Sequence, residues 1–229
     1  MSGVSESLNL GLTRALARIG LPPPEGLERL SGGANMESWR FSAGAETCVL
    51  RRAPSLDMMA GRPMDHAGEA ALIRRANAAG VMAPEVLVEL RPEDGLGSGY
   101  VMRAIPGSPD PNSFLVEADP QIAIQDIARE LAKTHATDCT GLQVPLMDTA
   151  AALGELRSRF LGYGGDRPIL ALALRWLEAN IPSPVTPQLV HGDFRLGNLM
   201  FENGRLTGVL DWELAHLGDW HEDLAFGCM

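Results

Sequence analysis

The chain has 229 residues, of which 45% are hydrophobic and 21% charged, and its formal net charge at pH 7 is −10. This length suffices for one large domain or two small lobes, and the composition supports an apolar core. The negative charge argues against nucleic acid or an anionic membrane surface as the main partner, because both would repel it. A local group of arginines and backbone N–H groups can still bind the phosphates of ATP.

The cysteines and the first residues bear on the cellular compartment. Cys48, Cys139 and Cys228 are far apart and odd in number, and none belongs to a Cys-x-x-Cys motif. This usage is typical of a reducing environment rather than of a disulfide framework. The first residues lack the basic start and apolar run of a signal peptide, and no apolar stretch approaches the length of a membrane span. We therefore expect a soluble, cytoplasmic protein.

The first predicted element is a helix over residues 7–20. Gly20 ends this helix, and the prolines at 22–24 prevent its continuation and form a linker. From residue 27 the pattern changes to strands, which we expect at 27–30, 37–41 and 47–51. The turn between the first two strands begins with Ser31, Gly32 and Gly33. Such a turn can lay its backbone N–H groups over a triphosphate, although Gly-Gly in a hairpin is by itself an ordinary turn.

Asp65 predicts the start of a second helix, which runs to Gly80. An aspartate at this position accepts hydrogen bonds from the first N–H groups of a helix. Residues 81–90 have the pattern of another strand, with Pro84 near its start.

The boundary between two parts of the chain follows the next predicted strand. Residues 99–107 have the pattern of a strand that ends in a connector. The stretch 106–113 is rich in Pro, Gly, Ser and Asp, which is typical of a linker. We therefore divide the chain into residues 1–105 and 106–229.

Three helices are predicted in the second part. Asp119 precedes the first, whose apolar face at helical spacing carries Ile124, Ile127, Leu131 and His135. A histidine on such a face is more typical of a hydrogen-bonded core residue than of a ligand. Residues 150–163 and 168–181 form the other two helices, and the apolar pattern around Trp176 indicates burial against the hairpin that follows.

A β-hairpin is predicted at 199–210. Asn203 and Gly204 separate two largely apolar runs, and both residue types accept the positive φ of a type I′ turn. This turn predicts three opposed pairs: Glu202 with Arg205, Met200 with Thr207, and Asn198 with Val209.

The register of this hairpin predicts a metal site. Because side chains alternate along a strand, Asn198 and Asp211 would lie on one face as diagonal neighbours, roughly 7–8 Å apart. A cation bound at about 2.1 Å from an oxygen of each would bridge that gap. The spacing therefore predicts a magnesium site, and Asp193 lies just before the first strand, close to the metal.

The motifs of this region recur in a fixed order that resembles a known family. They are His191-Gly192-Asp193, Asn198, Leu210-Asp211, Gly218-Asp219 and Asp223-Leu224-Ala225. Their order and spacing resemble the signature of the aminoglycoside phosphotransferase and choline kinase family, which has the protein-kinase fold. The sequence of residues 209–219 is most similar to that of the branch of kinase-like domains attached to acyl-CoA dehydrogenases.

This resemblance implies a fold and a catalytic centre. The fold is a two-lobed α+β structure, with an antiparallel sheet and a helix in the N-lobe and a mainly helical C-lobe. By resemblance Asp193 is the catalytic base, and Asn198 and Asp211 are the magnesium ligands. These roles match the general template of phosphoryl transfer, in which one Asp receives the hydroxyl proton while an Asn and a second Asp hold the metal.

The resemblance also implies a nucleotide site in the first part of the chain. It assigns the turn at Ser31, Gly32 and Gly33 to the phosphates, and Arg51 to the place of the phosphate-binding lysine. We choose Arg51 over Arg52 because Arg51 shares a strand face with Thr47 and Val49. An arginine there departs from the usual lysine, although its planar fork can contact phosphate. The resemblance further implies an ion pair of Arg51 with Glu69, and adenine contacts from the backbone of Met102, Arg103 and Ala104.

The expected reaction is transfer of the γ-phosphate of ATP to a hydroxyl of a small molecule, with magnesium as cofactor. The acceptor stays open between a hydroxylated acid or its CoA thioester and an aminoglycoside-like compound. One alternative is a nucleotide-binding pseudokinase or scaffold, against which the intact Asp193, Asn198 and Asp211 argue. Another is a metallohydrolase that uses His191, Asp193, Asp211, His216 and His221. No pair of these has the His-Glu-x-x-His arrangement, and imidazole-rich sites usually select zinc.

The resemblance finally implies helices beyond residue 229. Residues 220–229 have barely begun a helix, whereas the family continues with further C-lobe helices below the acceptor pocket. We therefore expect an incomplete C-lobe with an uncovered apolar face, through which the chain could associate with itself.

Overall fold

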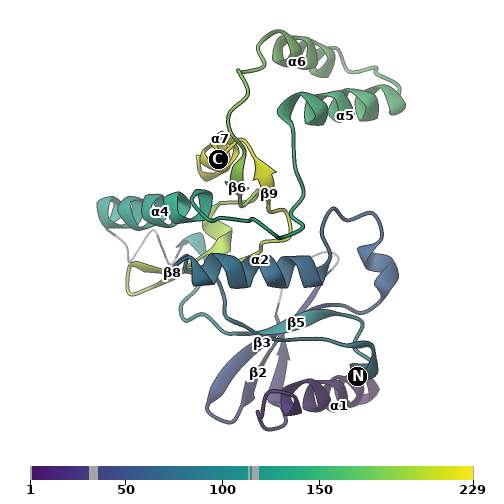
Figure 1. The fold of residues 1–229 in the computed structure, drawn as a ribbon, viewed down its shortest axis with the longest axis vertical. Coiled ribbons are helices and arrows are strands. Elements are labelled where there is room, and N and C mark those ends of the chain that lie inside the picture. Colours follow the sequence, from purple (N-terminus) through teal and green to yellow (C-terminus); the bar gives the residue numbers. More distant parts are fainter. Residues whose placement is uncertain (1, 31–35, 113, 115–118, 229) are drawn as a thin grey trace.

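A five-stranded antiparallel sheet occupies the first part of the chain in this computed structural model, which describes residues 2–30, 36–112, 114 and 119–228. The strand order is β1-β2-β3-β5-β4. The strands are β1 (Glu25–Arg29), β2 (Glu37–Ala43), β3 (Glu46–Ala53), β4 (Val86–Glu89) and β5 (Ser98–Arg103). The rest of the chain is mainly helical and carries two small two-stranded sheets (Figure 1). The expected α+β class is confirmed.

Helix α1 (Ser2–Ala17) covers one face of this sheet and helix α2 (His66–Ala78) covers the other (Figure 1). Leu8, Leu12 and Leu16 of α1 are buried in a core with Leu50 and Val101 of the sheet. The helix begins earlier than predicted and ends at Ala17, before Gly20. Two 3₁₀ helices lie in the loops of this part, η1 (Leu56–Met59) and η2 (Pro92–Asp94).

Helix α2 joins the two parts of the chain through a shared core. Asp65 caps it as predicted, accepting from the N–H of Gly68 at 2.8 Å. Its buried Leu72 and Ile73 belong to the same apolar cluster as Val209 and Trp212 of the second part. Helix α2 and the second part of the chain therefore share one apolar core.

The segment after α2 forms a strand only at 86–89, rather than over 81–90 as predicted. Its first residues connect to the second part of the chain instead. The N–H of Met82 donates to Glu130 at 2.8 Å, and the carbonyl of Met82 accepts from the N–H of Val209 at 2.8 Å. Pro84 has no N–H to give to a sheet ladder, which suits this change of role.

Helix α4 (Pro120–His135) lies against the hairpin and is capped by Asp119, as predicted. Of its predicted apolar face, Leu131 is buried, Ile127 packs against the core and the His135 side chain is only 10% exposed, whereas Ile124 is 65% exposed. The buried side chains also include Asp126 and Glu130. Asp126 accepts from Arg205 at 2.6 Å, so a charged pair adds to the contact with the hairpin.

Helices α5 (Thr149–Gly162) and α6 (Pro168–Ala179) contact each other and stand away from the rest of the molecule (Figure 1). Trp176 is 63% exposed, so its predicted burial against the hairpin is wrong. Large apolar side chains gather on these two helices. We call the exposed set the α5–α6 face: Leu156, Leu161, Ile169, Leu170, Leu172 and Trp176. No helix in the described part of the chain is long and apolar enough to cross a membrane.

The predicted hairpin consists of β7 (Leu199–Glu202) and β8 (Arg205–Val209), after the 3₁₀ helix η3 (Leu196–Asn198). Asn203 and Gly204 have φ of 51° and 72°, as a type I′ turn requires, and Glu202 lies opposite Arg205 as predicted. Farther from the turn the register shifts, so that Met200 lies opposite Gly208 instead of Thr207. The remaining elements are β6 (Gln188–Val190), which pairs with β9 (His216–Gly218), and the short helix α7 (His221–Gly227).

Candidate active site

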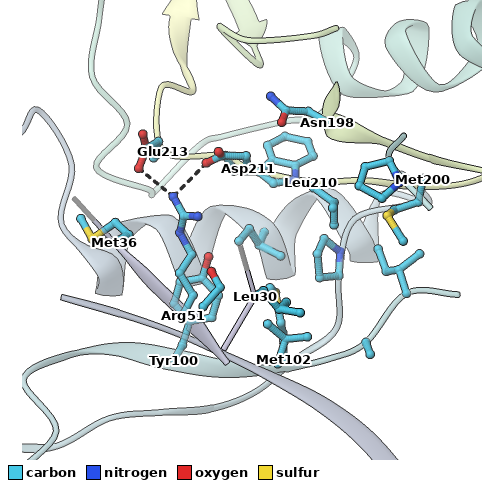
Figure 2. Close-up of a pocket in the computed structure, with 18 of the residues that line it drawn as sticks. Leu30, Met36, Arg51, Tyr100, Met102, Asn198, Met200, Leu210, Asp211 and Glu213 are labelled. Carbon is cyan, nitrogen blue, oxygen red and sulfur yellow. Dashed lines mark hydrogen bonds and ion pairs between the residues drawn. The ribbon is translucent and has the colours of Figure 1, made fainter. Parts of the chain in front are cut away.

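A pocket of about 700 Å³ lies between the sheet and the hairpin (Figure 2). Arg51 and Met102 line it from β3 and β5, while Asn198, Asp211 and Glu213 line it from the hairpin side. The pocket thus brings together residues that the sequence places in separate motifs. Ser31, Gly32 and Gly33, which were expected to contact phosphates, lie outside the described residues.

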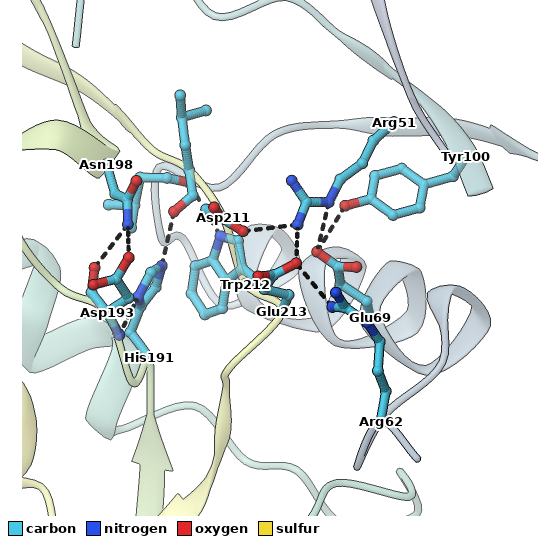
Figure 3. A network of polar contacts seen from close by, with 12 residues as sticks. Arg51, Arg62, Glu69, Tyr100, His191, Asp193, Asn198, Asp211, Trp212 and Glu213 are labelled. Atoms are coloured by element: carbon cyan, nitrogen blue, oxygen red, sulfur yellow. Dashed lines mark hydrogen bonds and ion pairs between the residues drawn. The ribbon is translucent and has the colours of Figure 1, made fainter. Parts of the chain in front are cut away.

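Asp193 lies in the loop between β6 and η3, and its carboxylate accepts from two side chains, one of which is Asn198 (Figure 3). Nδ2 of Asn198 donates to Oδ2 of Asp193 at 2.6 Å, and Nε of Arg195 donates to Oδ1 at 2.9 Å. Gly192 permits the tight loop, because its φ is 82° and a Cβ there would lie 2.5 Å from the carbonyl oxygen of Leu214. The carboxylate is therefore fixed in one orientation.

Asp223 of α7 holds this loop through hydrogen bonds. Its buried carboxylate accepts from the N–H of His191 at 2.8 Å, from the N–H of Gly192 at 2.9 Å and from His135 at 3.0 Å. Burial by itself would raise the pKa of Asp223, but the bonds from His135 and the two backbone N–H groups outweigh it, so the pKa is lowered. The expectation that His135 is a hydrogen-bonded core residue is confirmed.

Asn198 and Asp211 reach the pocket by a different route from the one predicted. Asn198 ends η3, before the strand, and its carbonyl accepts from the N–H of Leu210 at 2.8 Å. Strand β8 ends at Val209, and Asp211 has the left-handed φ of 64°. The argument from one shared strand face is therefore wrong, because an extra residue in β8 and the left-handed turn both alter the alternation. Both side chains nevertheless line the pocket.

The side-chain oxygen atoms of Asn198 and Asp211 are suitable ligands for magnesium. Asn198 gives its amide N–H groups to Asp193, which directs its amide oxygen elsewhere, and the carboxylate of Asp211 is about one-third exposed at 34%. Magnesium prefers such hard oxygen ligands and usually needs only one or two protein groups besides phosphates and water. Within the described residues no set of three or more His, Cys, Asp or Glu side chains could hold a metal.

Arg51 connects the two walls of the pocket (Figure 3). Its Nη2 donates to Asp211 at 2.8 Å and to Glu213 at 2.7 Å, and its Nε lies 3.4 Å from Glu69, so the expected pair with Glu69 is present. Tyr100 donates to Glu69 at 3.0 Å. Burial raises the pKa of Glu69, and the charge of Arg51 opposes that rise.

The alternation argument that selected Arg51 agrees with the structure. Arg52 points away from the pocket and donates to Glu37 at 2.8 Å. Burial lowers the pKa of the Arg51 guanidinium and the surrounding carboxylates raise it, with a net rise. Arg51 therefore carries its charge at any physiological pH.

Three residues of this network, Tyr100, Glu213 and Arg62, were not predicted from the sequence. Glu213 accepts from Arg51, and the same oxygen accepts from Arg62 at 3.0 Å. Glu213 lies two residues after Asp211, and that spacing could have suggested it. Arg62 lies in a loop without a motif, so its sequence gave no signal.

Two N–H groups of residues 102–104 already have partners in the fold. The N–H of Arg103 donates to the carbonyl of Glu85 at 2.8 Å and the N–H of Ala104 donates to the carbonyl of Thr47 at 2.9 Å, so an adenine contact would use other backbone groups. The expected adenine contacts stay a prediction. Met102, Arg103 and Ala104 do line the pocket.

The connector that follows β5 is attached to the hairpin. A Cβ at Gly107 would lie 2.2 Å from the carbonyl oxygen of Phe201, and φ of Gly107 is 103°, so only glycine fits. Ser108 and Phe201 exchange two backbone hydrogen bonds, at 2.9 and 3.0 Å. The end of β5 and the hairpin are therefore fixed relative to each other.

The histidines do not form the alternative metallohydrolase site. His191 bonds through Nε2 to the carbonyl of Leu210, and His216 through Nδ1 to the carbonyl of Leu214. His221 bonds to Asp219 at 2.7 Å. These rings are used by separate structural contacts, in keeping with the lack of a three-ligand cluster among the residues described.

The fold and this arrangement of residues are of the kinase-like class. Residues 26–229 match the phosphotransferase enzyme family, and the chain belongs to that family. This confirms the resemblance seen in the sequence.

The curated relatives are larger proteins. The chain is 29% identical to mouse acyl-CoA dehydrogenase family member 10 over 223 residues, covering 90% of this chain and 20% of that protein. It is 27% identical to chicken acyl-CoA dehydrogenase family member 11 over 238 residues, covering 96% and 30%. A shorter stretch of 60 residues is 47% identical to a probable acyl-CoA dehydrogenase of Arabidopsis thaliana, IBR3, covering 24% and 7%. The chain thus spans less than a third of the length of these relatives.

Solved structures with the same fold include antibiotic phosphotransferases. One is a thermostable mutant of aminoglycoside phosphotransferase APH(4)-Ia in complex with AMP-PNP and hygromycin B, with a TM-score of 0.70 and 20% identity. The match covers 96% of this chain and 75% of that one. Another is macrolide 2'-phosphotransferase MphH from Brachybacterium faecium, with a TM-score of 0.67, 23% identity and coverage of 96% and 76%. The two-lobed kinase-like fold expected from the sequence is confirmed by these likenesses.

Proposed function

We propose that this chain catalyses the transfer of the γ-phosphate of ATP to a hydroxyl group of a small molecule. The observation that carries the proposal is that Asn198 and Asp211 line one wall of a pocket whose other wall presents Arg51, while Asp193 is hydrogen-bonded to Asn198. This is the set of groups that phosphoryl transfer requires.

Each residue has a role in this proposal. Asp193 accepts the proton of the acceptor hydroxyl, and its bonds to Asn198 and Arg195 hold it in place for that task. Asn198 and Asp211 would hold magnesium, which supplies neutralisation of the phosphate charge when it is bound. Arg51 exchanges its bonds to Asp211 and Glu213 for bonds to the phosphates of the nucleotide.

The remaining nucleotide contacts are also proposals. Glu69 and Tyr100 hold Arg51 in position from the side of α2 and β5. Because the N–H groups of Arg103 and Ala104 have partners, we assign adenine to the carbonyl groups of residues 102–104. The loop of Ser31, Gly32 and Gly33 stays assigned to the phosphates.

Calorimetry with and without metal tests the nucleotide and metal assignment together. ATP should bind more tightly in the presence of magnesium than in EDTA, because Asn198 and Asp211 both line the pocket and would hold the metal. Asp211→Ala should remove most of that difference. Equal affinity under both conditions would contradict the metal site, and the absence of ATP binding would contradict the whole proposal.

The acceptor is proposed from two lines of likeness. The names of the curated relatives favour a hydroxylated acid or its CoA thioester, whereas the antibiotic complexes favour an aminoglycoside-like compound. Screening hydroxylated acids, their thioesters and aminoglycosides for ATP consumption separates the two. ATP binding without turnover of any of them would favour the pseudokinase alternative.

Two further proposals concern the setting of the enzyme. Cys48, Cys139 and Cys228 are all free thiols, which supports a reducing compartment, and we propose the cytoplasm. The α5–α6 face is apolar and exposed, and we propose that it mediates self-association.

A further inference from the structure

Arg195 is an exposed cation beside the proposed catalytic base. Its Nε donates to Oδ1 of Asp193 at 2.9 Å, and it lines the same pocket as Asn198 and Asp211. The side chain of Arg195 is 56% exposed and that of Asp193 only 20%. Among the residues that the structure describes, nothing accepts a hydrogen bond from the terminal nitrogens Nη1 and Nη2. A guanidinium group has five N–H donors, so most of its capacity remains open.

Gly197 provides the space in which this guanidinium group lies. A Cβ built at Gly197 would be 2.7 Å from Nη1 of Arg195, so the end of this flexible side chain would have to shift. The backbone of Gly197 is outside the left-handed region, so its conformation does not itself require glycine. The lack of a side chain at residue 197 therefore leaves room for the guanidinium group of Arg195. An alanine at 197 should move the flexible arginine and leave the loop folded.

Asp193 uses only one of the N–H donors of Arg195. Oδ2 of Asp193 already accepts from Asn198 at 2.6 Å, and Oδ1 engages only Nε of Arg195. The two terminal nitrogens of a guanidinium group form a fork that matches carboxylate and phosphate oxygens. In a chain with a net charge of −10, such a cation at the pocket is well placed to attract an anion locally.

We propose that Arg195 is an anion-binding residue on the acceptor side of Asp193. Its terminal nitrogens bind an oxyanion that lies next to the reacting hydroxyl. This oxyanion is either the terminal phosphate of the nucleotide or an acidic group of the acceptor. The inference rests on the proposed function, because that function places the hydroxyl at Asp193.

The first arm of the test measures nucleotides. Calorimetry with ATP and with ADP, both with magnesium, is carried out on the wild type, Arg195→Gln, Arg195→Lys and Gly197→Ala. Arg175→Gln is the matched control, because Arg175 is an exposed arginine of α6, remote from the pocket. If the terminal phosphate is the anion, Arg195→Gln weakens ATP about tenfold or more and leaves ADP unchanged, as expected for the loss of a charge-assisted hydrogen bond. Gly197→Ala should give the same pattern, and Arg195→Lys should restore part of the loss.

The second arm measures a small carboxylate. Labelled malonate is added to the magnesium–ADP complex, and its binding is followed by NMR line broadening. If an acidic group of the acceptor is the anion, the wild type and the Arg175→Gln control broaden malonate. Arg195→Gln and Gly197→Ala then lose the broadening, and ATP affinity stays unchanged in all variants.

The outcomes separate this inference from the proposed function. A wild type that binds ATP no better with magnesium than with EDTA contradicts the proposed function itself. If that preference is present, but Arg195→Gln and Gly197→Ala match the wild type in both arms, only the role of Arg195 is overturned. Circular dichroism of Gly197→Ala checks that this variant is folded, and in a folded variant a loss reports the displaced guanidinium group.

Discussion

The carboxylate of Asp193 has two fixed donors but no other partner among the described residues, which suits a base that awaits a proton. Asp193→Asn should keep nucleotide binding and lose turnover, because an amide cannot accept the hydroxyl proton. Loss of one well-placed base typically costs about 10²–10⁴-fold in rate. The measurement is phosphate transfer to an acceptor found in the screen, with the ATP affinity of the same sample. Asp166→Asn, in the exposed loop before α6, is the control, and near-normal turnover of Asp193→Asn would show that Asp193 is not the base.

Arg51 is nearly buried among Glu69, Asp211 and Glu213, so its removal acts on binding and on stability. Arg51→Met should weaken ATP binding, since the phosphates lose their cation. It should also lower the melting temperature, because removing one partner of a buried ion pair leaves uncompensated charge that costs about 3–5 kcal/mol. Calorimetry and thermal melting of the same preparation report both effects. Unchanged ATP affinity would mean that Arg51 is only a structural residue.

At the scale of elements, the buried carboxylate of Asp223 ties helix α7 to the catalytic loop. Its pKa is lowered in the folded state, so the stabilisation is present above the unfolded pKa of about 3.9 and is lost as the pH falls through the folded value. Asp223→Asn should therefore be less stable than the wild type at pH 7, and this difference should shrink from about pH 5 downward. Urea unfolding at several pH values measures it. A difference that stays constant down to pH 3 would contradict the assigned role.

The sequence predicted those features that depend only on residues close together in the chain, namely helix caps and a tight turn. Asp65 and Asp119 cap their helices because a short side chain can reach the first N–H groups without help from the rest of the fold. The Asn203–Gly204 turn also needs only its own φ angles. The bulge in β8 could not be predicted, because Thr207 is held by distant groups. Its hydroxyl donates to the carbonyl of Pro106 at 2.7 Å.

The site was predicted in its residues and not in its geometry. The motif singled out Asp193, Asn198 and Asp211, of which Asn198 and Asp211 line the pocket and Asp193 is hydrogen-bonded to Asn198. Arg62 could not be predicted from the sequence, because it lines the pocket from a loop without a motif and pairs with Glu213 across a long chain separation. The exposure of Ile124 and the burial of Asp126 on α4 were not predicted, because the ion pair of Asp126 with the distant Arg205 cannot be read from local spacing.

At the scale of the whole molecule, the α5–α6 face is the largest departure from the expected burial. Leu172 and Trp176 are 64% and 63% exposed, and monomeric proteins rarely leave such residues gathered together. Sedimentation velocity over a concentration series should therefore show self-association and hydrophobic dyes should bind. Leu172→Glu should reduce both, whereas Glu155→Gln on the polar side of α5 should not. A wild type that is monodisperse and dye-silent at all concentrations would contradict the proposal.

The apolar cluster that contains both α2 and the hairpin has a consequence for cooperativity. Because Ile73 and Trp212 belong to one core, the two walls of the pocket cannot lose their packing independently. Differential scanning calorimetry should accordingly record a single endotherm for both parts of the chain, whose calorimetric and van't Hoff enthalpies agree. A nucleotide bound between the walls would then shift the whole endotherm upward, because it is linked to the only folding equilibrium the two parts share.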